Sequence, residues 1–325
     1  MRRQRERVSV GTRKVKYEGL RAAVESCGYI FGERGGRGAS AAVFHATRIG
    51  GNGRDLAIKI LAGRDAEPCW RRECAALTKL ARSKKPCPYV PQILDSFALE
   101  QTEDTEGSAL YALVTPFYGS GTLRGLLNKN NGRLDTATCD ELFNHISDAM
   151  CAAHSMGIVH CNIKLDNILL DRRESDGQLR AVLCNWDLCK LEQPRECHVM
   201  RGTLMYAAPE LAMYMIKRHL MMKLPEEQRA NTNQERLGKQ RPYNAMACDA
   251  WALRLCLWIM TISRHPFNSD SSEETYQLIK KSTAAMSEHE RRRQSCVPED
   301  HWEIITMLMQ ARPEHQWQVQ LSTSK

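Results

Sequence analysis

The sequence predicts an α+β fold whose strands come first and whose helices follow. Three observations support this. The 325 residues are enough to build two lobes with separate cores. Strand-like segments fill residues 28–59, and an apolar strand is expected at Leu110–Thr115. Apolar residues then recur at helical spacing over residues 142–153, and Gly157 stands where that helix would end.

The charge balance of the chain is modestly basic. Its 46 basic and 38 acidic residues give a formal net charge of +8, which fits acidic partners, nucleotide phosphates or no particular ligand. Part of the excess lies in residues 1–27, which we interpret as a basic N-terminal segment. Its basic run comprises residues 1–7, followed by Arg13, Lys14 and Lys16. A nuclear-localisation or polyanion-binding patch is one interpretation of this run, and a solvated tail is the favoured one.

The cysteines and the hydropathy indicate a reduced, intracellular protein. The 13 cysteines include no C-x-x-C pair, so a zinc site is not expected. The longest apolar stretch, residues 245–262, is interrupted by Asp249 and Arg254, so no membrane span is expected. The N-terminus has no apolar leader, which favours the cytoplasm by default, although a truncated N-terminus would leave secretion open.

Two features of the first strands suggest phosphate binding. Residues 36–43 read G-R-G-A-S-A-A-V, and glycines let backbone N–H groups approach phosphates closely. Residues 32–35 offer competing registers for this glycine motif, and a flexible glycine turn is the alternative interpretation. Lys59 follows inside an apolar strand, where a lysine needs a partner or a ligand. Glu73 faces the right side of the next helix, which Asp65 begins, so we predict a Lys59–Glu73 ion pair; a surface glutamate is the alternative.

Four later stretches place polar residues at fixed positions among apolar ones. Residues 160–170 read H-C-N-I-K-L-D-N-I-L-L, and residues 183–188 read L-C-N-W-D-L. Residues 202–210 read G-T-L-M-Y-A-A-P-E, and residues 248–253 read C-D-A-W-A-L, with H-P-F at 265–267. In this order and at this spacing, the motifs resemble those of eukaryotic protein kinases of the serine/threonine type, over roughly residues 28–318.

The resemblance implies the two-lobed protein-kinase-like fold, with a small β-rich N-lobe, a large mainly helical C-lobe and ATP as the cofactor. It implies an N-lobe at 28–117, a C-lobe at 118–318 and a tail at 319–325. Within the C-lobe, residues 217–241 are longer than the family needs and are interpreted as a surface insert. The insert and the altered motifs also loosely resemble the secreted rhoptry kinases of apicomplexan parasites.

The resemblance also assigns site residues. Those implied to bind the nucleotide are Gly36, Gly38, Val43, Ala57, Lys59, Glu73, Thr115, Phe117 and Leu169. Those in the positions of the catalytic loop are Asn162, Lys164 and Asn167, and Asn185 stands in the position of the metal-binding aspartate. Asp249 is implied to bind the backbone of the catalytic loop. Gln316 replaces the arginine that would pair with Glu210.

The sequence departs from the family pattern at residues that would take part in phosphoryl transfer. Asn162 replaces the aspartate that accepts the substrate proton, and loss of such a base typically slows a reaction about 10²–10⁴-fold. Asn185 replaces a magnesium ligand, and amides are poor ligands for Mg²⁺. If any residue binds a metal, it is Asn167, Asn185 or Asp187, so a role for Mg²⁺ is left open. Cys161 replaces an arginine of the family motif.

Two functional hypotheses follow. The leading one is a pseudokinase that binds ATP weakly, with little dependence on metal, and serves as a scaffold or allosteric regulator of a protein partner, such as an active kinase or its substrate. The alternative is an active serine/threonine kinase in which Asp187 or Asp166 supplies the missing carboxylate. Only the basic N-terminal segment favours nucleic-acid binding, so no nucleic acid is expected as a partner.

Overall fold

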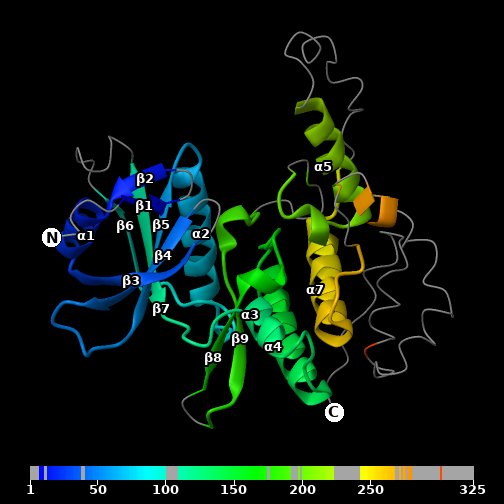
Figure 1. The fold of residues 1–325 in the computed structure, drawn as a ribbon, viewed down its shortest axis with the longest axis horizontal. Coiled ribbons are helices and arrows are strands. Elements are labelled where there is room, and N and C mark those ends of the chain that lie inside the picture. Colours follow the sequence, from blue (N-terminus) through cyan, green and yellow to red (C-terminus); the bar gives the residue numbers. More distant parts are fainter. Residues whose placement is uncertain are drawn as a thin grey trace. The chain divides into compact units, whose positions relative to one another are not determined.

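The structure is a computed structural model of the chain that describes most of the first 267 residues. The described residues are 7–10, 13–37, 41–99, 109–173, 176–191, 197, 200–222, 242–267, 271, 274–275, 277–279 and 301. The chain forms two compact units (Figure 1). The first contains the residues up to Ser120 together with Cys184–Asp187, and the second contains the remainder. The predicted α+β class is confirmed.

A five-stranded antiparallel sheet forms the centre of the first unit. Its strands are β3 (Tyr29–Arg37), β4 (Ala41–Arg48), β5 (Leu56–Ala62), β6 (Asp95–Leu99) and β7 (Leu110–Pro116). They lie in the order β3-β4-β5-β7-β6. The strands expected within residues 28–59 and at 110–115 are thereby confirmed. β3 is irregular, because its register against β4 shifts after Phe31 and again after Arg34.

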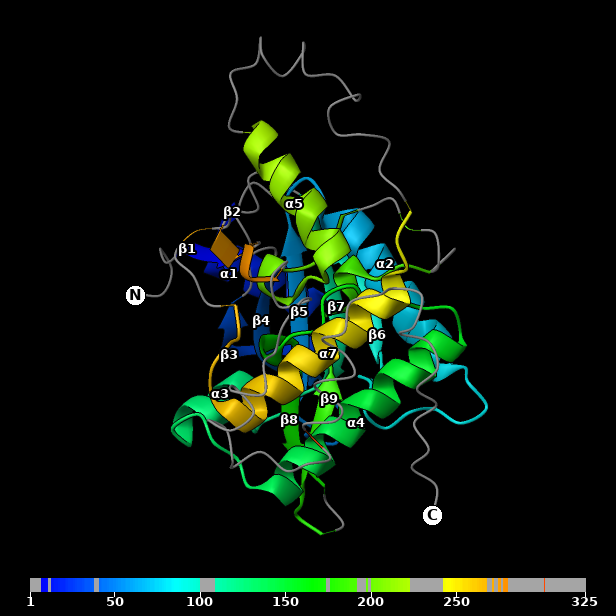
Figure 2. The ribbon, with the colours of Figure 1, turned by 90° about the vertical axis from the view of Figure 1, so that its right-hand side faces the viewer.

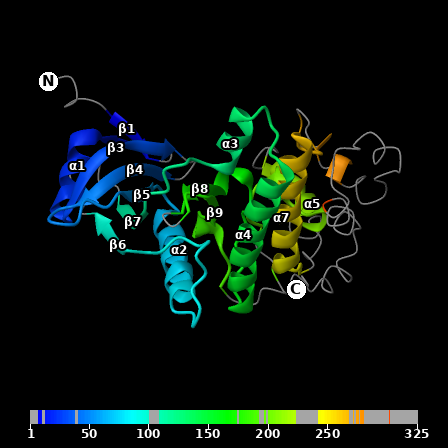
Figure 3. The same cartoon turned by 90° about the horizontal axis from the view of Figure 1, so that it is seen from below.

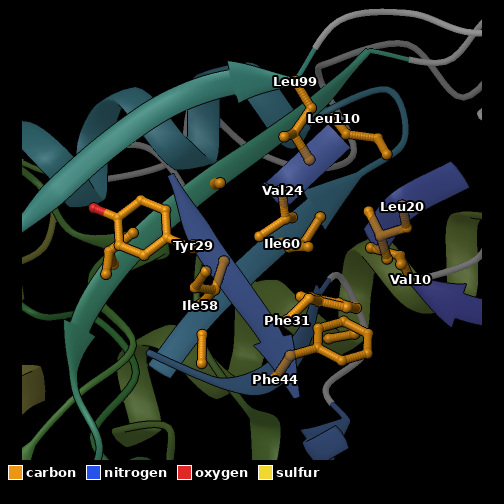
Figure 4. Close-up of a cluster of buried hydrophobic side chains, with 14 of the residues drawn as sticks. Val10, Leu20, Val24, Tyr29, Phe31, Phe44, Ile58, Ile60, Leu99 and Leu110 are labelled. Atoms are coloured by element: carbon orange, nitrogen blue, oxygen red, sulfur yellow. The ribbon is translucent and has the colours of Figure 1, made fainter. Parts of the chain in front are cut away.

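A small N-terminal module covers one face of this sheet. It consists of β1 (Arg7–Val10), β2 (Arg13–Lys16) and α1 (Tyr17–Ser26). Val10, Leu20 and Val24 are fully buried in one cluster with side chains of the sheet, including Phe44 and Ile58 (Figure 4). Of the basic run interpreted as a solvated tail, Arg7 lies in β1, and the basic residues of 13–16 lie in β2, so these residues belong to strands of the module and not to a tail; residues 1–6 lie outside the described residues. Without this cover, the apolar face of the sheet would be exposed to water.

Helix α2 (Ala66–Ala81) packs against the opposite face of the sheet, beside β5 and β7 (Figure 3). It begins directly after Asp65, as predicted. The indole N–H of Trp70 donates a hydrogen bond of 2.9 Å to the backbone oxygen of Ala112 in β7. Ala66, Cys69, Ala76, Leu77 and Leu80 are the apolar residues that α2 buries.

The second unit is mainly helical. Its helices are α3 (Leu123–Lys129), α4 (Thr136–Ser155), α5 (Pro209–Met222) and α7 (Ala245–Ile262), with a hairpin of β8 (Ile168–Arg172) and β9 (Leu179–Leu183). Helix α4 lies beside α7 and also contacts β9 (Figure 2). The carboxylate of Asp135 caps the first turn of α4, and Gly157 follows its end with φ of 71°, as the sequence predicts.

Helix α7 is long and apolar enough to qualify as a membrane span by composition, but most of it is buried inside the unit. The predicted insert at 217–241 begins within α5, and residues 223–241 lie outside the described residues. Gln316 and the predicted tail at 319–325 also lie outside them.

Candidate functional site

Strand alternation in the first unit gathers predicted nucleotide-binding residues on one face of the sheet. Phe44, Ile58 and Val114 belong to the buried cluster under the N-terminal module. Their neighbours therefore point to the other face, because successive side chains of a strand alternate. These neighbours include Val43, Ala57, Lys59 and Thr115. In the ladders, Val43 pairs with Lys59 and Ala57 pairs with Thr115.

The ion pair predicted on this face is confirmed. Lys59 Nζ lies 2.6 Å from Glu73 Oε2, and the Glu73 side chain is almost fully buried. Burial acts to lower the pKa of Lys59, but the carboxylates of Glu73 and Asp187 outweigh it, so the pKa is raised. Burial, with Asp187 adding to it, raises the pKa of Glu73 against the opposing effect of Lys59. The ammonium therefore stays protonated around neutral pH.

The segment Cys184–Asp187 contributes a second partner to this lysine. Lys59 Nζ donates a hydrogen bond of 2.5 Å to Asn185 Oδ1. Asn185 has a φ of 68°, in the left-handed region that asparagine tolerates better than most residues. Its amide oxygen is therefore aimed at the lysine by a specific backbone conformation.

The same segment is also bound to α2. The backbone N–H of Trp186 donates to Glu73 Oε1 at 3.1 Å, and Arg72 Nε donates to the backbone oxygen of Asp187 at 3.0 Å. The Trp186 side chain is fully buried. Glu73 of α2 thus connects the lysine strand with the Asn185 segment through its two carboxylate oxygens.

The predicted glycine loop and hinge are described only in part. Gly36 lies in β3, whereas Gly38 lies outside the described residues. Phe117 is half-buried; its backbone N–H donates to the oxygen of Asp55, and its ring meets the His45 ring edge-on at 4.9 Å. At Gly32, a Cβ would come within 2.7 Å of the backbone oxygen of His45, so the irregular part of β3 requires a glycine.

In the second unit, Asp249 of α7 binds the loop at residues 160–167, as predicted. Its carboxylate accepts hydrogen bonds from the backbone N–H groups of His160 at 2.7 Å and Cys161 at 2.8 Å. His154 Nε2 lies 3.0 Å from the same carboxylate. Cys161 has a φ of 64°, a strained conformation for a cysteine, so the two hydrogen bonds hold a turn that the residue would not favour alone.

Asn162 is at the centre of a polar network in this loop. Its Oδ1 accepts a hydrogen bond of 2.9 Å from the Thr203 hydroxyl, and its backbone oxygen accepts one of 2.7 Å from Asn167 Nδ2. Lys164 Nζ donates to Thr203 Oγ1 at 3.2 Å. The three predicted catalytic-loop residues are thus brought together, but sequence reasoning missed Thr203. Its position in the G-T-x-x-Y motif was the available signal.

A small cavity, with room for about one water, lies behind this loop and is bordered by Cys161, Arg201, Tyr243 and Cys248. Burial raises the pKa of the Cys161 and Cys248 thiols, so neither has the thiolate character of a reactive cysteine. The Cys248 thiol donates to Glu210 Oε1 at 3.6 Å, and burial raises the pKa of that carboxyl group.

Leu169, the predicted nucleotide-binding residue of the second unit, lies half-buried in β8. It pairs with Val182 of β9 and forms an isolated bridge with Thr122.

The donor chemistry at one of the family's two metal positions does not fit Mg²⁺. Asn167 is the residue type that the family uses as a metal ligand. Asn185 instead offers an amide oxygen in the position of a carboxylate, and its Oδ1 already accepts a hydrogen bond from a protonated lysine. Magnesium prefers charged carboxylate oxygens. Within the described part of the chain, no group of three or more His, Cys, Asp or Glu side chains is placed to hold a metal ion.

Comparison with known proteins agrees with the motifs. The protein kinase domain family matches residues 29–224. CBL-interacting protein kinase 22 of Oryza sativa subsp. japonica is 25% identical over 277 residues, covering 77% of this chain and 52% of that protein. Serine/threonine-protein kinase PkaA of Streptomyces coelicolor is 26% identical over 304 residues, covering 88% of this chain and 47% of that protein. This chain thus spans about half the length of these two relatives. Because the family match covers more than half of its residues, the chain belongs to the protein kinase family.

Proposed function

We propose that this protein kinase domain is a pseudokinase that binds ATP weakly, without needing a divalent metal, and acts as a scaffold or allosteric regulator of a signalling partner. The observation that carries the proposal is the hydrogen bond from Lys59 to Asn185 Oδ1. The protein kinase family generally uses ATP, and its metal ions neutralise the charge of the transferred phosphoryl group. Here a neutral amide, already bonded to a cation, occupies the position of a metal-binding carboxylate.

Lys59 is the positively charged group that would bind the nucleotide phosphates in place of a metal ion. Its raised pKa keeps it positively charged, and its Nζ lies on the sheet face that also presents Val43 and Ala57. A phosphate oxygen approaching Lys59 competes with Glu73 and Asn185 for the same ammonium group. This competition supports weak binding, and an amide in the metal position supports little dependence on divalent ions.

The chemistry of Asn162 supports a protein that does not transfer phosphate. An asparagine side chain cannot accept a proton at neutral pH, and its Oδ1 already accepts the Thr203 hydroxyl hydrogen. Residues of this loop could orient a hydroxyl group, but none of Asn162, Lys164 and Asn167 supplies a carboxylate base.

A binding role needs a stable shape rather than a catalytic cycle. In the first unit, hydrogen bonds join Lys59 to Glu73 and Asn185, and Arg72 adds a further bond between α2 and the Asn185 segment. A closely bonded network of this kind supports a domain of fixed shape, which suits a scaffold.

The alternative is an active serine/threonine kinase with an unconventional metal ligand. Asp187 favours it, because its carboxylate is close enough to raise the pKa of both Lys59 and Glu73. A divalent metal held by the Asp187 carboxylate would offset its negative charge and would supply positive charge for the nucleotide phosphates.

A thermal-shift titration combined with a transfer assay separates the two functions. The wild-type chain is titrated with ATP in the presence of EDTA, Mg²⁺ or Mn²⁺, and transfer of labelled phosphate to a generic basic protein is measured with Lys59→Ala as the blank. We expect a small stabilisation by ATP that is equal in all three buffers, and no transfer above the blank. Strong stabilisation that requires Mg²⁺ or Mn²⁺, or transfer that depends on Lys59, would establish the active kinase instead.

A further inference from the structure

The sheet of the first unit carries a second concave site, formed where its two edge strands meet. Tyr29 in β3 donates a hydrogen bond of 2.7 Å from its hydroxyl group to Asp95 Oδ2 in β6. The ring of Tyr29 also stacks on Phe97, with ring centroids 5.8 Å apart. Because β3 and β6 are the opposite edges of the five-stranded order, these contacts show that the sheet curls almost into a barrel.

A cavity of about 240 Å³ opens at this corner. Its lining includes Tyr29, Arg48, Arg54, Leu56 and Leu94. Mouths of curled sheets are common places for ligands, but small-molecule sites usually measure about 300–1,000 Å³. The volume is therefore too small for a nucleotide and suits a single large side chain.

The cavity has a partly apolar wall. Leu56 and Leu94 both line it, and Leu94 is one of the five large apolar residues that are exposed within the described part of the chain. Two leucines beside the Tyr29 ring suit contact with an apolar side chain.

The rim of the cavity is positively charged. Arg48 and Arg54 both line it, both are exposed, and neither guanidinium has a hydrogen-bond or ion-pair partner among the described residues. Neither of the nearby carboxylates lines the cavity. Asp95 accepts from Tyr29 and from the backbone of Ser96, and Asp55 accepts from His45. Among the described residues, the site thus offers two unpaired cations beside a partly apolar wall.

We propose that this corner docks an acidic segment of a partner protein, with one large apolar side chain in the cavity and flanking carboxylates on Arg48 and Arg54. Apolar contact supplies most of the affinity, and the arginines set orientation and charge selectivity. Guanidinium groups suit this role because they bind carboxylates through two parallel hydrogen bonds. The proposal holds whether or not the chain transfers phosphate, because it uses none of the residues of the candidate nucleotide site.

Fluorescence anisotropy with labelled peptides tests the proposal on the full chain. The probe is a short peptide with one phenylalanine flanked by glutamates. Its counterparts carry alanine in place of phenylalanine, lysines in place of the glutamates, or phosphoserines in place of the glutamates. We expect the acidic phenylalanine peptide to bind at least about tenfold more tightly than the alanine and lysine peptides, and to weaken as salt is raised.

Charge reversal locates the binding site. The double variant Arg48→Glu/Arg54→Glu should weaken the acidic phenylalanine peptide at least about tenfold. The matched double variant Arg64→Glu/Arg82→Glu, which changes two other exposed arginines of the same unit, should bind it like the wild type. Because all four side chains are exposed, the variants should fold, and an unchanged melting temperature checks this.

Three outcomes would overturn the proposal. They are no binding of the acidic phenylalanine peptide by the wild type at millimolar concentration, equal binding of the lysine peptide, and undiminished binding by Arg48→Glu/Arg54→Glu. Binding of the phosphoserine peptide alone would overturn the assignment to carboxylates.

Discussion

The Lys59 ammonium donates a hydrogen bond of 2.5 Å to the side-chain oxygen of Asn185. Lys59 is the predicted phosphate-binding residue, and Asn185 stands in the family's metal-binding position. The same ammonium is paired with Glu73. A carboxylate at position 185 would add a third negative group around Lys59, beside Glu73 and Asp187. A divalent cation could then offset part of that charge. The neutral amide of Asn185 adds no negative charge, so no metal ion is needed to balance it. We therefore infer that the amide stabilises the unit when no metal is bound.

The first prediction concerns the variant Asn185→Asp. Without ligand it should melt at a lower temperature than the wild type, because its new carboxylate is added close to two others. With ATP, it should be stabilised by Mg²⁺ or Mn²⁺, whereas the wild type should not distinguish these buffers from EDTA. Thermal shift measures both effects, and the neutral variant Asn185→Ser is the control. Metal-independent behaviour of Asn185→Asp would show that residue 185 does not decide metal binding.

The second prediction concerns Glu73→Gln. Removing one partner of a buried ion pair leaves the other charge uncompensated, which typically costs about 3–5 kcal/mol. Both side chains of this pair are largely buried, and Glu73 also accepts from the Trp186 backbone. The free energy of unfolding from urea titration should fall by about this amount. Glu67→Gln, which breaks the exposed pair with Arg71 on the same helix, should have little effect. Equal effects of the two variants would contradict the prediction.

The ion pair of Lys59 could be predicted because a lysine inside an apolar strand requires a partner, and a helix of known direction offered one. The role of Asp249 could be predicted because its motif is specific. The burial of Leu20 and Val24 was missed because the surrounding arginines and lysines hide a short apolar stripe. The hydrogen bond from Thr203 to Asn162 was missed because only the folded chain brings together two residues that are 41 positions apart.

The third prediction concerns Asp249→Asn. One oxygen of the carboxylate becomes an N–H₂ group, so a donor would face the backbone donor of His160 or Cys161. Because Asp249 is almost fully buried, the variant should lose about 1–3 kcal/mol of stability. Amide hydrogen exchange at the two backbone groups should also accelerate. Asp166→Asn, an exposed carboxylate of the same loop, is the control and should change neither measurement. Unchanged exchange in Asp249→Asn would contradict the assigned role.

The fourth prediction concerns Arg254 in α7. The residue is half-buried, and its Nη1 atom is buried without a hydrogen-bond partner in the described part of the chain. Burial lowers the pKa of Arg254 to about 9, because the charged guanidinium loses hydration inside the protein. Arg254→Met keeps an unbranched side chain and removes the charge, so it should stabilise the protein by about 1–3 kcal/mol. Arg254→Lys keeps the charge and should not. Destabilisation by methionine in a thermal melt would show that the guanidinium has a stabilising partner.

The last prediction concerns the pH dependence of stability through His265. This residue stands between the rings of Tyr206 and Phe267, at centroid distances of 5.4 and 5.8 Å, and its Nδ1 accepts a hydrogen bond from the Phe267 backbone. Burial, assisted by the charge of Arg124, lowers the pKa of His265 to about 4, from 6.5 for an unperturbed histidine. The folded state therefore holds this ring neutral where the unfolded state would protonate it.

The direction of the effect follows from proton linkage. Between the two pKa values, the unfolded state binds more protons at this ring than the folded state, so stability falls as the pH is lowered from 6.5 towards 4. The steepest loss is about 1.4 kcal/mol per pH unit. His265→Asn keeps an acceptor near the Phe267 backbone but does not titrate, so urea titrations across this range should show a shallower dependence than the wild type. His219→Asn, at an exposed position of α5, should keep the wild-type slope. Equal slopes for His265→Asn and the wild type would mean that other groups carry the acid sensitivity of the protein.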